Sequence, residues 1–140
     1  MVIFGTFKGF KNNDCGTADL IFTKITNDLG NEVIGLRFYK QNIKSRMIKL
    51  KFGNRYLLET DDDDDESIIL LRKVKKNPKC DIVRRFKDEF HFIGGKYQGK
   101  KDNEINLIEL SRYCIWLGYN SYNEVTIRNS LAILNKIHNK

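Results

Sequence analysis

The chain has 140 residues, of which 25 are Lys or Arg and 18 are Asp or Glu, so its formal net charge is +7 at pH 7. This length lets one domain bury a core without staples, and three distant cysteines outside any CxxC spacing argue against a disulfide framework and a zinc site. No apolar run approaches the roughly 18 residues of a membrane span, and the N-terminus lacks the pattern of a signal peptide. We therefore expect a soluble, cytoplasmic protein without membrane contact.

The charge is distributed unevenly along the chain. Residues 1–58 carry ten basic and four acidic side chains, residues 59–66 carry seven acidic ones, residues 67–101 carry eleven basic and three acidic ones, and residues 102–140 carry four of each. The first hundred residues are thus basic apart from one acidic loop at 59–66, and such a field attracts polyanions. The abundance of Lys, Asn and Ile suggests an AT-rich genome, such as that of a virus, a mobile element or a low-GC bacterium.

The first two thirds of the chain have the patterns of β-strands. Two apolar, β-branched runs at residues 20–25 and 33–39 flank a turn-rich interval, which predicts a hairpin. Alternation of apolar and basic residues at 47–52 predicts a strand with one buried face. Further apolar runs predict strands at residues 56–58, 68–74 and 90–93, which gives five to seven strands before residue 100.

The last third changes to helical spacing. Apolar residues between 107 and 117 predict a helix that ends at Gly118, and a capping box of Ser121 and Glu124 predicts the start of a second helix. We expect one α+β domain, residues 1–140, in which an antiparallel sheet or small barrel is covered by a C-terminal helical hairpin. By analogy of architecture, the strand-rich part resembles a small barrel such as the OB-fold. The hairpin carries no net charge, so we expect a structural cover with Trp116 buried and with Lys136 unimportant for binding.

A glycine-rich segment, residues 94–101, matches the pattern GxxxxGK between a predicted strand and a predicted helix. A nucleotide-hydrolysing P-loop requires Ser or Thr after its Lys to bind magnesium, and Lys101 occupies that position here. The pattern therefore does not favour nucleotide hydrolysis. Backbone amides exposed by the glycines, beside Lys96, Lys100 and Lys101, would still suit a phosphate group.

No pattern predicts an active site or a metal centre. The five contiguous aspartates at 61–65 lack the spacing and the glycine of a calcium loop and are expected to be solvated or to screen the basic residues. His91 and His138 have no Cys or acid at ligand spacing. We expect no catalytic residue, metal or cofactor, and the sequence does not favour an enzyme.

Two basic clusters are the predicted binding residues. On a sheet, cations interleaved with exposed aromatic rings are typical of surfaces that bind single-stranded nucleic acid. The predicted contact residues are Lys49, Lys51, Arg55, Tyr56, Arg72, Lys73, Lys75, Lys76, Arg84, Arg85, Lys96, Lys100 and Lys101. The favoured function is a non-enzymatic accessory protein that binds nucleic acid, preferably single-stranded, or a nucleoprotein. The alternative is a small viral or mobile-element inhibitor or adaptor that contacts a host protein, for example a host defence nucleoprotein.

Overall fold

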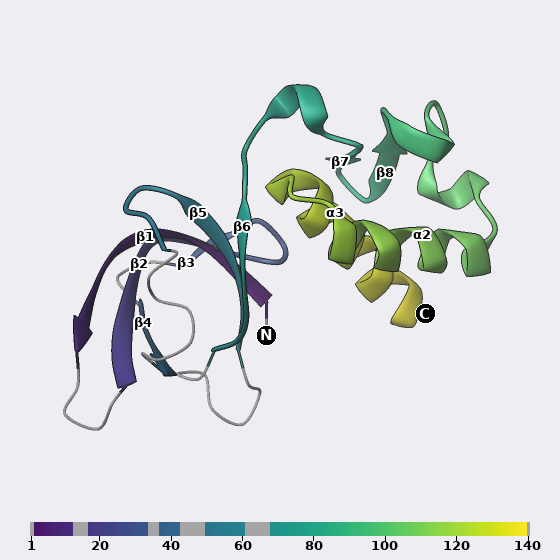
Figure 1. The fold of residues 1–140 in the computed structure, drawn as a ribbon. Coiled ribbons are helices and arrows are strands. Elements are labelled where there is room, and N and C mark those ends of the chain that lie inside the picture. The colour runs from purple at the N-terminus through teal and green to yellow at the C-terminus, as the bar shows by residue number, and fades with distance from the viewer. Residues whose placement is uncertain (1, 13–16, 34–36, 43–49, 61–67, 140) are drawn as a thin grey trace. The chain divides into compact units, whose positions relative to one another are not determined.

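The computed structural model describes residues 2–12, 17–33, 37–42, 50–60 and 68–139 (Figure 1). The chain divides into two compact units, Met1–Val74 and Lys75–Lys140, and each unit is described by itself. The first unit consists of strands and the second holds both α-helices, which confirms the α+β class. The acidic residues 61–66 lie outside the described residues. The prediction of a single domain stays a prediction.

The first unit is one antiparallel sheet. Its strands follow the order β3-β2-β1-β5-β6, and β4 also pairs with β2. The strands are β1 (Val2–Asn12), β2 (Thr17–Asn27), β3 (Glu32–Val33), β4 (Arg37–Asn42), β5 (Arg55–Thr60) and β6 (Ile68–Val74). The predicted hairpin and the strand at 68–74 are confirmed. No pairing among the described strands closes the sheet, so the barrel resembling an OB-fold is not confirmed.

Apolar side chains of this sheet form one cluster of buried residues. Phe7, Phe22 and Tyr56 meet edge to face, with ring centroids 5.6 to 6.5 Å apart. Burying aromatic side chains of this size removes a large apolar area from water, which is the main stabilising term for such a sheet. The other buried members of the cluster are Ile3, Ala18, Leu20, Ile25 and Leu58.

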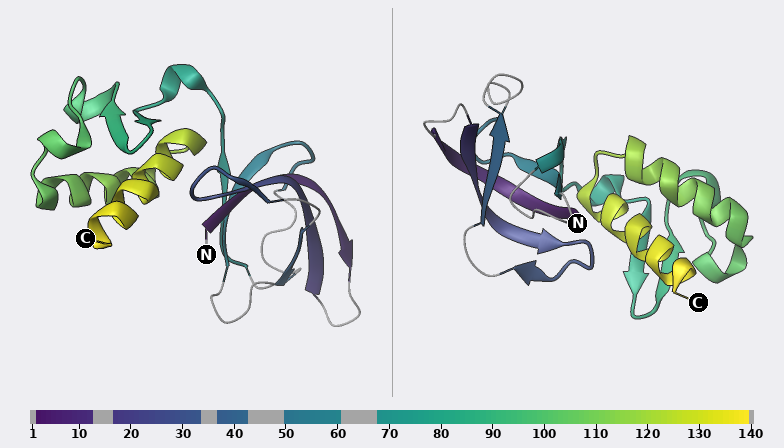
Figure 2. Two further views of the ribbon diagram at one scale, coloured as in Figure 1. Left: turned by 180° about the vertical axis from the view of Figure 1, so that it is seen from behind. Right: turned by 90° about the horizontal axis from the view of Figure 1, so that it is seen from below.

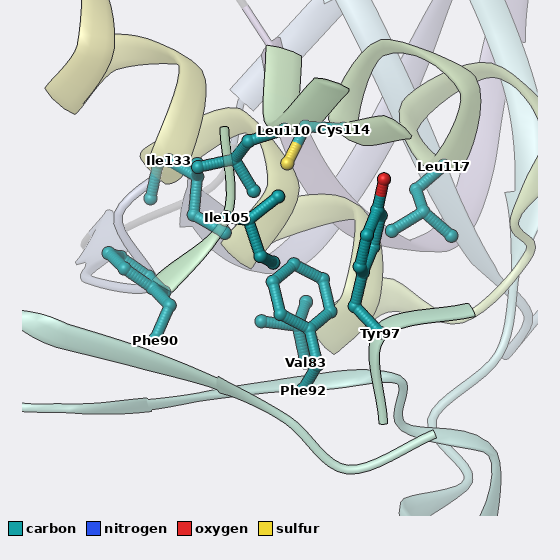
Figure 3. Close-up of a cluster of buried hydrophobic side chains, with 10 residues drawn as sticks. Val83, Phe90, Phe92, Tyr97, Ile105, Leu110, Cys114, Leu117 and Ile133 are labelled. Atoms are coloured by element: carbon teal, nitrogen blue, oxygen red, sulfur yellow. The ribbon is translucent and has the colours of Figure 1, made fainter. Parts of the chain in front are cut away.

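The second unit packs a short hairpin against two helices (Figure 2). Its elements are η2 (Pro78–Cys80), β7 (Val83–Phe86), β8 (Glu89–Phe92), η3 (Gly95–Tyr97), η4 (Asp102–Glu104), α2 (Leu107–Asn120) and α3 (Glu124–His138). Figure 3 shows Val83 and Phe92 of the hairpin pointing toward Leu110, Cys114 and Ile133 of the helices. This core makes the helical hairpin and the β7–β8 hairpin one packed body.

The helix ends differ in detail from those predicted. Helix α2 continues past Gly118 to Asn120, because Gly118 does not adopt a positive φ and so does not end the helix. The N-cap of α3 is Asn123, whose side chain accepts from the amide of Thr126 at 2.8 Å. The hydroxyl of Ser121 instead accepts from the Asn123 amide at 3.1 Å, which turns the chain between the helices.

A buried carboxylate braces the hairpin against α3. Asp102 is 5% exposed, and its Oδ1 accepts from the amide of Phe90 at 3.2 Å. Its Oδ2 accepts from Lys136 Nζ at 3.0 Å, and the same Nζ donates to the carbonyl of Asp88 at 2.8 Å. Lys136 is therefore a structural residue, and the expectation that it is unimportant for binding stays a prediction.

Candidate nucleic-acid interface

The first predicted cluster does not form a strand face. Lys49 lies outside the described residues. Lys51 is exposed, but it precedes a turn: the amide of Gly53 donates to the Phe7 carbonyl at 2.9 Å, and Gly53 has φ +84°. The predicted strand at 47–52 is therefore wrong for residues 50–52, because this segment turns where the chain bonds to Phe7 in the middle of β1.

Arg55 is occupied within the fold. Its guanidinium donates to Thr6 Oγ1 at 3.1 Å, to Thr26 Oγ1 at 3.0 Å and to the carbonyl of Lys24. Lys24 has φ +50° at a bulge in the pairing of β2 with β1, a conformation that a non-glycine residue adopts at a cost. Arg55 thus satisfies the backbone of the bulge, and its guanidinium already has three internal acceptors.

Tyr56 is also part of the core. The residue is 4% exposed, and its hydroxyl accepts from the amide of Lys51 at 2.9 Å. A base cannot reach the face of this ring without opening the sheet. The prediction of an exposed Tyr56 is wrong, because Tyr56 packs in the core cluster with Phe7 and Phe22.

The second predicted cluster extends from one unit into the other. In β6, Arg72 is half-buried and Lys73 is exposed. Lys75 and Lys76, both exposed, begin the second unit. Lys76 Nζ lies 3.5 Å from Oε2 of Glu124, whose side chain is fully buried, so this lysine serves the stability of the unit.

The outer face of the β7–β8 hairpin brings cations and an aromatic ring together. Arg84 pairs with His91 in the hairpin register, and His91 pairs on its other side with Lys101. Paired positions in antiparallel strands project to the same face, so these three residues form a row. Phe86 lies beside the row, 53% exposed, with its ring centroid 4.8 Å from that of His91. We call Arg84, Phe86, His91 and Lys101 the hairpin surface.

The carboxylate of Glu89 would compete with a phosphate for the cations of the hairpin surface. Glu89 Oε2 lies 3.2 Å from His91 Nε2 and 3.7 Å from Lys101 Nζ. The hydrogen bond from His91, followed by the charge of Lys101, lowers the pKa of Glu89. Arg84 has a similar neighbour, since Asp81 Oδ2 lies 3.7 Å from its Nε. The pairs of Glu89 are exposed and therefore weak, so a phosphate can displace this carboxylate at small cost, whereas the Asp81 side chain is only 8% exposed and holds Arg84 more firmly.

Arg85 has a structural role on the opposite face of the hairpin. Its guanidinium lies 5.4 Å from the centroid of the Phe90 ring, and its Nε donates to the carbonyl of Lys87 at 2.9 Å. Lys87 has φ +57° in the turn between β7 and β8. Arg85 therefore stabilises the turn, whereas its neighbour Arg84 faces the hairpin surface.

The backbone amides of the glycine-rich segment are used internally. Of the eight residues from Gly94 to Lys101, six donate their amide hydrogen to protein acceptors, including the amide of Lys96 to Tyr113 Oη at 3.3 Å. A phosphate cradle needs several free amides that converge on one point. The segment thus offers only exposed lysine side chains, Lys96 and Lys100, and the expected amide cradle does not form.

Trp116 is exposed, contrary to the prediction of a buried indole. It is 56% exposed and lies parallel to Tyr113, with 6.1 Å between ring centroids and 9° between ring planes. Leu110, Cys114 and Leu117 occupy the buried side of α2, so the core is filled without the indole. Next to Tyr113 a shallow hollow of about 290 Å³ is lined by Lys96, Tyr97, Glu109, Arg112 and Tyr113.

Comparisons with known proteins give no further guide. The sequence matches no family model, and no curated protein and no solved structure is similar to it. Within the described ranges, no three His, Cys, Asp or Glu side chains are grouped so that they could hold a metal ion. In the same part of the chain, neither α-helix has the length and apolar character needed to cross a bilayer.

Sequence reasoning missed Phe86 and the strand that carries it. Residues 83–86 read as part of a basic cluster because two of the four are arginines. The period of two was the available signal: Val83 is buried and Arg85 covers Phe90, which leaves Arg84 and Phe86 on the other face.

Proposed function

We propose that this chain is a non-enzymatic accessory protein that binds single-stranded nucleic acid through the hairpin surface. The observation that carries the proposal is the exposed Phe86 ring against His91, flanked by Arg84 and Lys101. A base stacked on such a ring gains about 1–3 kcal/mol, and the flanking cations contact phosphates. Because stacking and phosphate contacts ignore base identity, the expected binding has little sequence preference.

Further cations of the second unit support this proposal. Lys87, Lys96 and Lys100 are exposed and form no ion pair with any residue in the described part of the chain. Their charge raises the positive potential that a polyanion meets on approach, which increases the association rate at low salt. Glu89 opposes the same potential, so Glu89→Gln is expected to tighten binding.

Fluorescence anisotropy with a labelled oligo(dT) tests the proposal. Phe86→Ala is expected to weaken binding about 5- to 150-fold, which corresponds to the stacking energy of one base. Phe52→Ala is the matched control, because Phe52 is a more exposed Phe beside Lys51 of the first predicted cluster. Replacing both Arg84 and Lys101 by Ala is expected to reduce the log-log salt slope by about 1.4, since each single-strand phosphate contact contributes about 0.7.

The opposite pattern would reject the hairpin surface. If Phe52→Ala weakens binding and Phe86→Ala does not, the contact lies in the turn that Lys51 precedes. If the oligonucleotide does not bind at low salt, nucleic-acid binding is rejected altogether, because the electrostatic attraction is strongest there.

A further inference from the structure

Helix α2 has a second apolar face that the core does not use. Leu110, Cys114 and Leu117 are buried, whereas Ile108, Ile115, Trp116 and Tyr119 are between 48% and 75% exposed. At 100° per residue the exposed residues form a stripe opposite to the buried ones. We call Ile108, Arg112, Ile115, Trp116 and Tyr119 the α2 stripe. Exposed apolar surface grouped in this way is typical of an interaction site.

The spacing of the α2 stripe fits a helix as the partner. Ile108, Arg112, Ile115 and Tyr119 are separated by steps of four, three and four residues, which is the a/d spacing of a heptad. This spacing lets each side chain insert between residues of a second helix that crosses at about 20°. Trp116 follows Ile115 and widens the stripe on one side. A nucleic-acid strand would not require this period.

The charge of the α2 stripe decides which kind of helix fits. Arg112 lies in the middle of the stripe, is exposed, and has no ion pair with any residue that the structure describes. Lys96 shares the adjacent hollow with Arg112, and Glu109 at its edge lies 3.4 Å from the Tyr97 hydroxyl. Covering Arg112 with an apolar helix would bury an unpaired charge, which is costly. The partner therefore needs a carboxylate opposite Arg112.

A second copy of this chain does not meet that requirement. In a parallel pair of α2 helices, Arg112 faces Arg112 of the other copy, and like charges repel. In an antiparallel pair centred on the stripe, Arg112 faces Ile115. The register that places Glu109 opposite Arg112 also places Ile115 opposite Asn106, which precedes the helix. Each arrangement sacrifices either the ion pair or half of the apolar contacts.

We propose that the α2 stripe is a docking surface for an acidic amphipathic helix of another protein. The partner helix supplies apolar residues at heptad spacing and places a Glu or Asp against Arg112 and Lys96. This site is separate from the hairpin surface and does not depend on nucleic-acid binding. A single docked helix makes a small interface, so the dissociation constant is expected to be roughly 1–100 μM.

Two synthetic peptides test the proposal on the full chain. Each has about 18 residues, or five helical turns, with Leu at the heptad a and d positions. One peptide carries Glu at the flanking positions, and the other carries Lys there. By fluorescence anisotropy, the Glu peptide is expected to bind at least 10-fold more tightly than the Lys peptide. Trp116→Ala is expected to weaken its binding several-fold.

A charge reversal separates local contact from general attraction to a basic protein. Arg112→Glu is expected to reverse the preference between the two peptides. Arg128→Glu on α3 makes the same change of net charge away from the stripe and is expected to preserve the preference. Both variants are checked for an unchanged helical circular dichroism spectrum before binding is compared.

Three results would overturn the proposal. The first is binding of neither peptide to the wild-type chain at concentrations up to about 200 μM, twice the upper expected dissociation constant. The second is an equal effect of Arg112→Glu and Arg128→Glu, which would mean that only net charge matters. The third is a dimer in analytical ultracentrifugation that Ile115→Glu dissociates, since this would assign the stripe to a second copy. Loss of oligo(dT) binding in Phe86→Ala, with unchanged peptide binding, would concern only the nucleic-acid binding proposed for the hairpin surface and would leave the docking proposal unchanged.

Discussion

Lys136→Ala is expected to destabilise the second unit, because it leaves the Asp102 carboxylate buried without its cation. Removing one partner of a fully buried ion pair costs about 3–5 kcal/mol. The Lys136 side chain is 36% exposed, so water can partly replace it, and the Phe90 amide remains a donor to Asp102. We therefore expect a loss of about 2 kcal/mol. With an m-value of about 2 kcal/mol/M, the urea midpoint falls by about 1 M.

Circular dichroism at 222 nm measures this transition, because both α-helices belong to the second unit. Arg128→Ala is the matched control: it removes a cation from the same helix, and its expected effect is within about 0.5 kcal/mol. Asp102→Asn combined with Lys136→Ala should cost less than the sum of the two single changes, because the pair is lost only once. Equal urea midpoints for Lys136→Ala and Arg128→Ala would show that the contact between Lys136 and Asp102 does not stabilise the second unit.

Three smaller predictions concern other contacts. Gly95→Ala is expected to lower the free energy of unfolding in urea by about 1–2 kcal/mol because of its φ of +73° alone. A further loss is expected because the new Cβ would lie 2.4 Å from Tyr113 Oη. Adding Tyr113→Phe should therefore restore part of the lost stability. In a chain whose third cysteine, Cys15, is replaced by Ser, exposed Cys80 is expected to react with a thiol reagent at neutral pH. Cys114 is expected to stay protected until unfolding, because burial raises the pKa of its thiol to about 12. His91 and Lys101 lower the pKa of Glu89, so the stability that Glu89 contributes is present above its ordinary pKa and is lost as the pH falls through its pKa in the folded state. The difference in urea midpoint between wild type and Glu89→Gln should therefore shrink from about pH 6 to about pH 3.

The sequence predicts elements whose pattern is local. A short run of apolar and β-branched residues predicted the strand at 68–74, and helical spacing predicted both α-helices, because each pattern lies within the segment itself. The segment at 50–52 also alternates, but its course is decided by hydrogen bonds between a turn and Phe7 in the middle of β1. Such contacts join residues distant in the chain and leave no local signal.

The roles of single cations could not be predicted for the same reason. Arg55 meets the Lys24 carbonyl across 31 positions of sequence, and Lys136 meets Asp102 across 34. A count of Lys and Arg therefore predicts a basic surface but does not separate structural cations from available ones. The exposed Trp116 shows the complementary limit, because helical spacing does not reveal which of two apolar faces the core buries.

Photo-crosslinking tests the central claim, binding through the hairpin surface, most directly. An oligonucleotide with 5-iodouracil at each position in turn is irradiated with the full chain, and the crosslinked peptide is identified by mass spectrometry. The expected crosslink lies within residues 83–92, at Phe86 or His91, because the exposed Phe86 ring contacts the half-buried His91 ring on the hairpin surface. Crosslinks confined to residues 50–58, or to Trp116 of the α2 stripe, would contradict the claim.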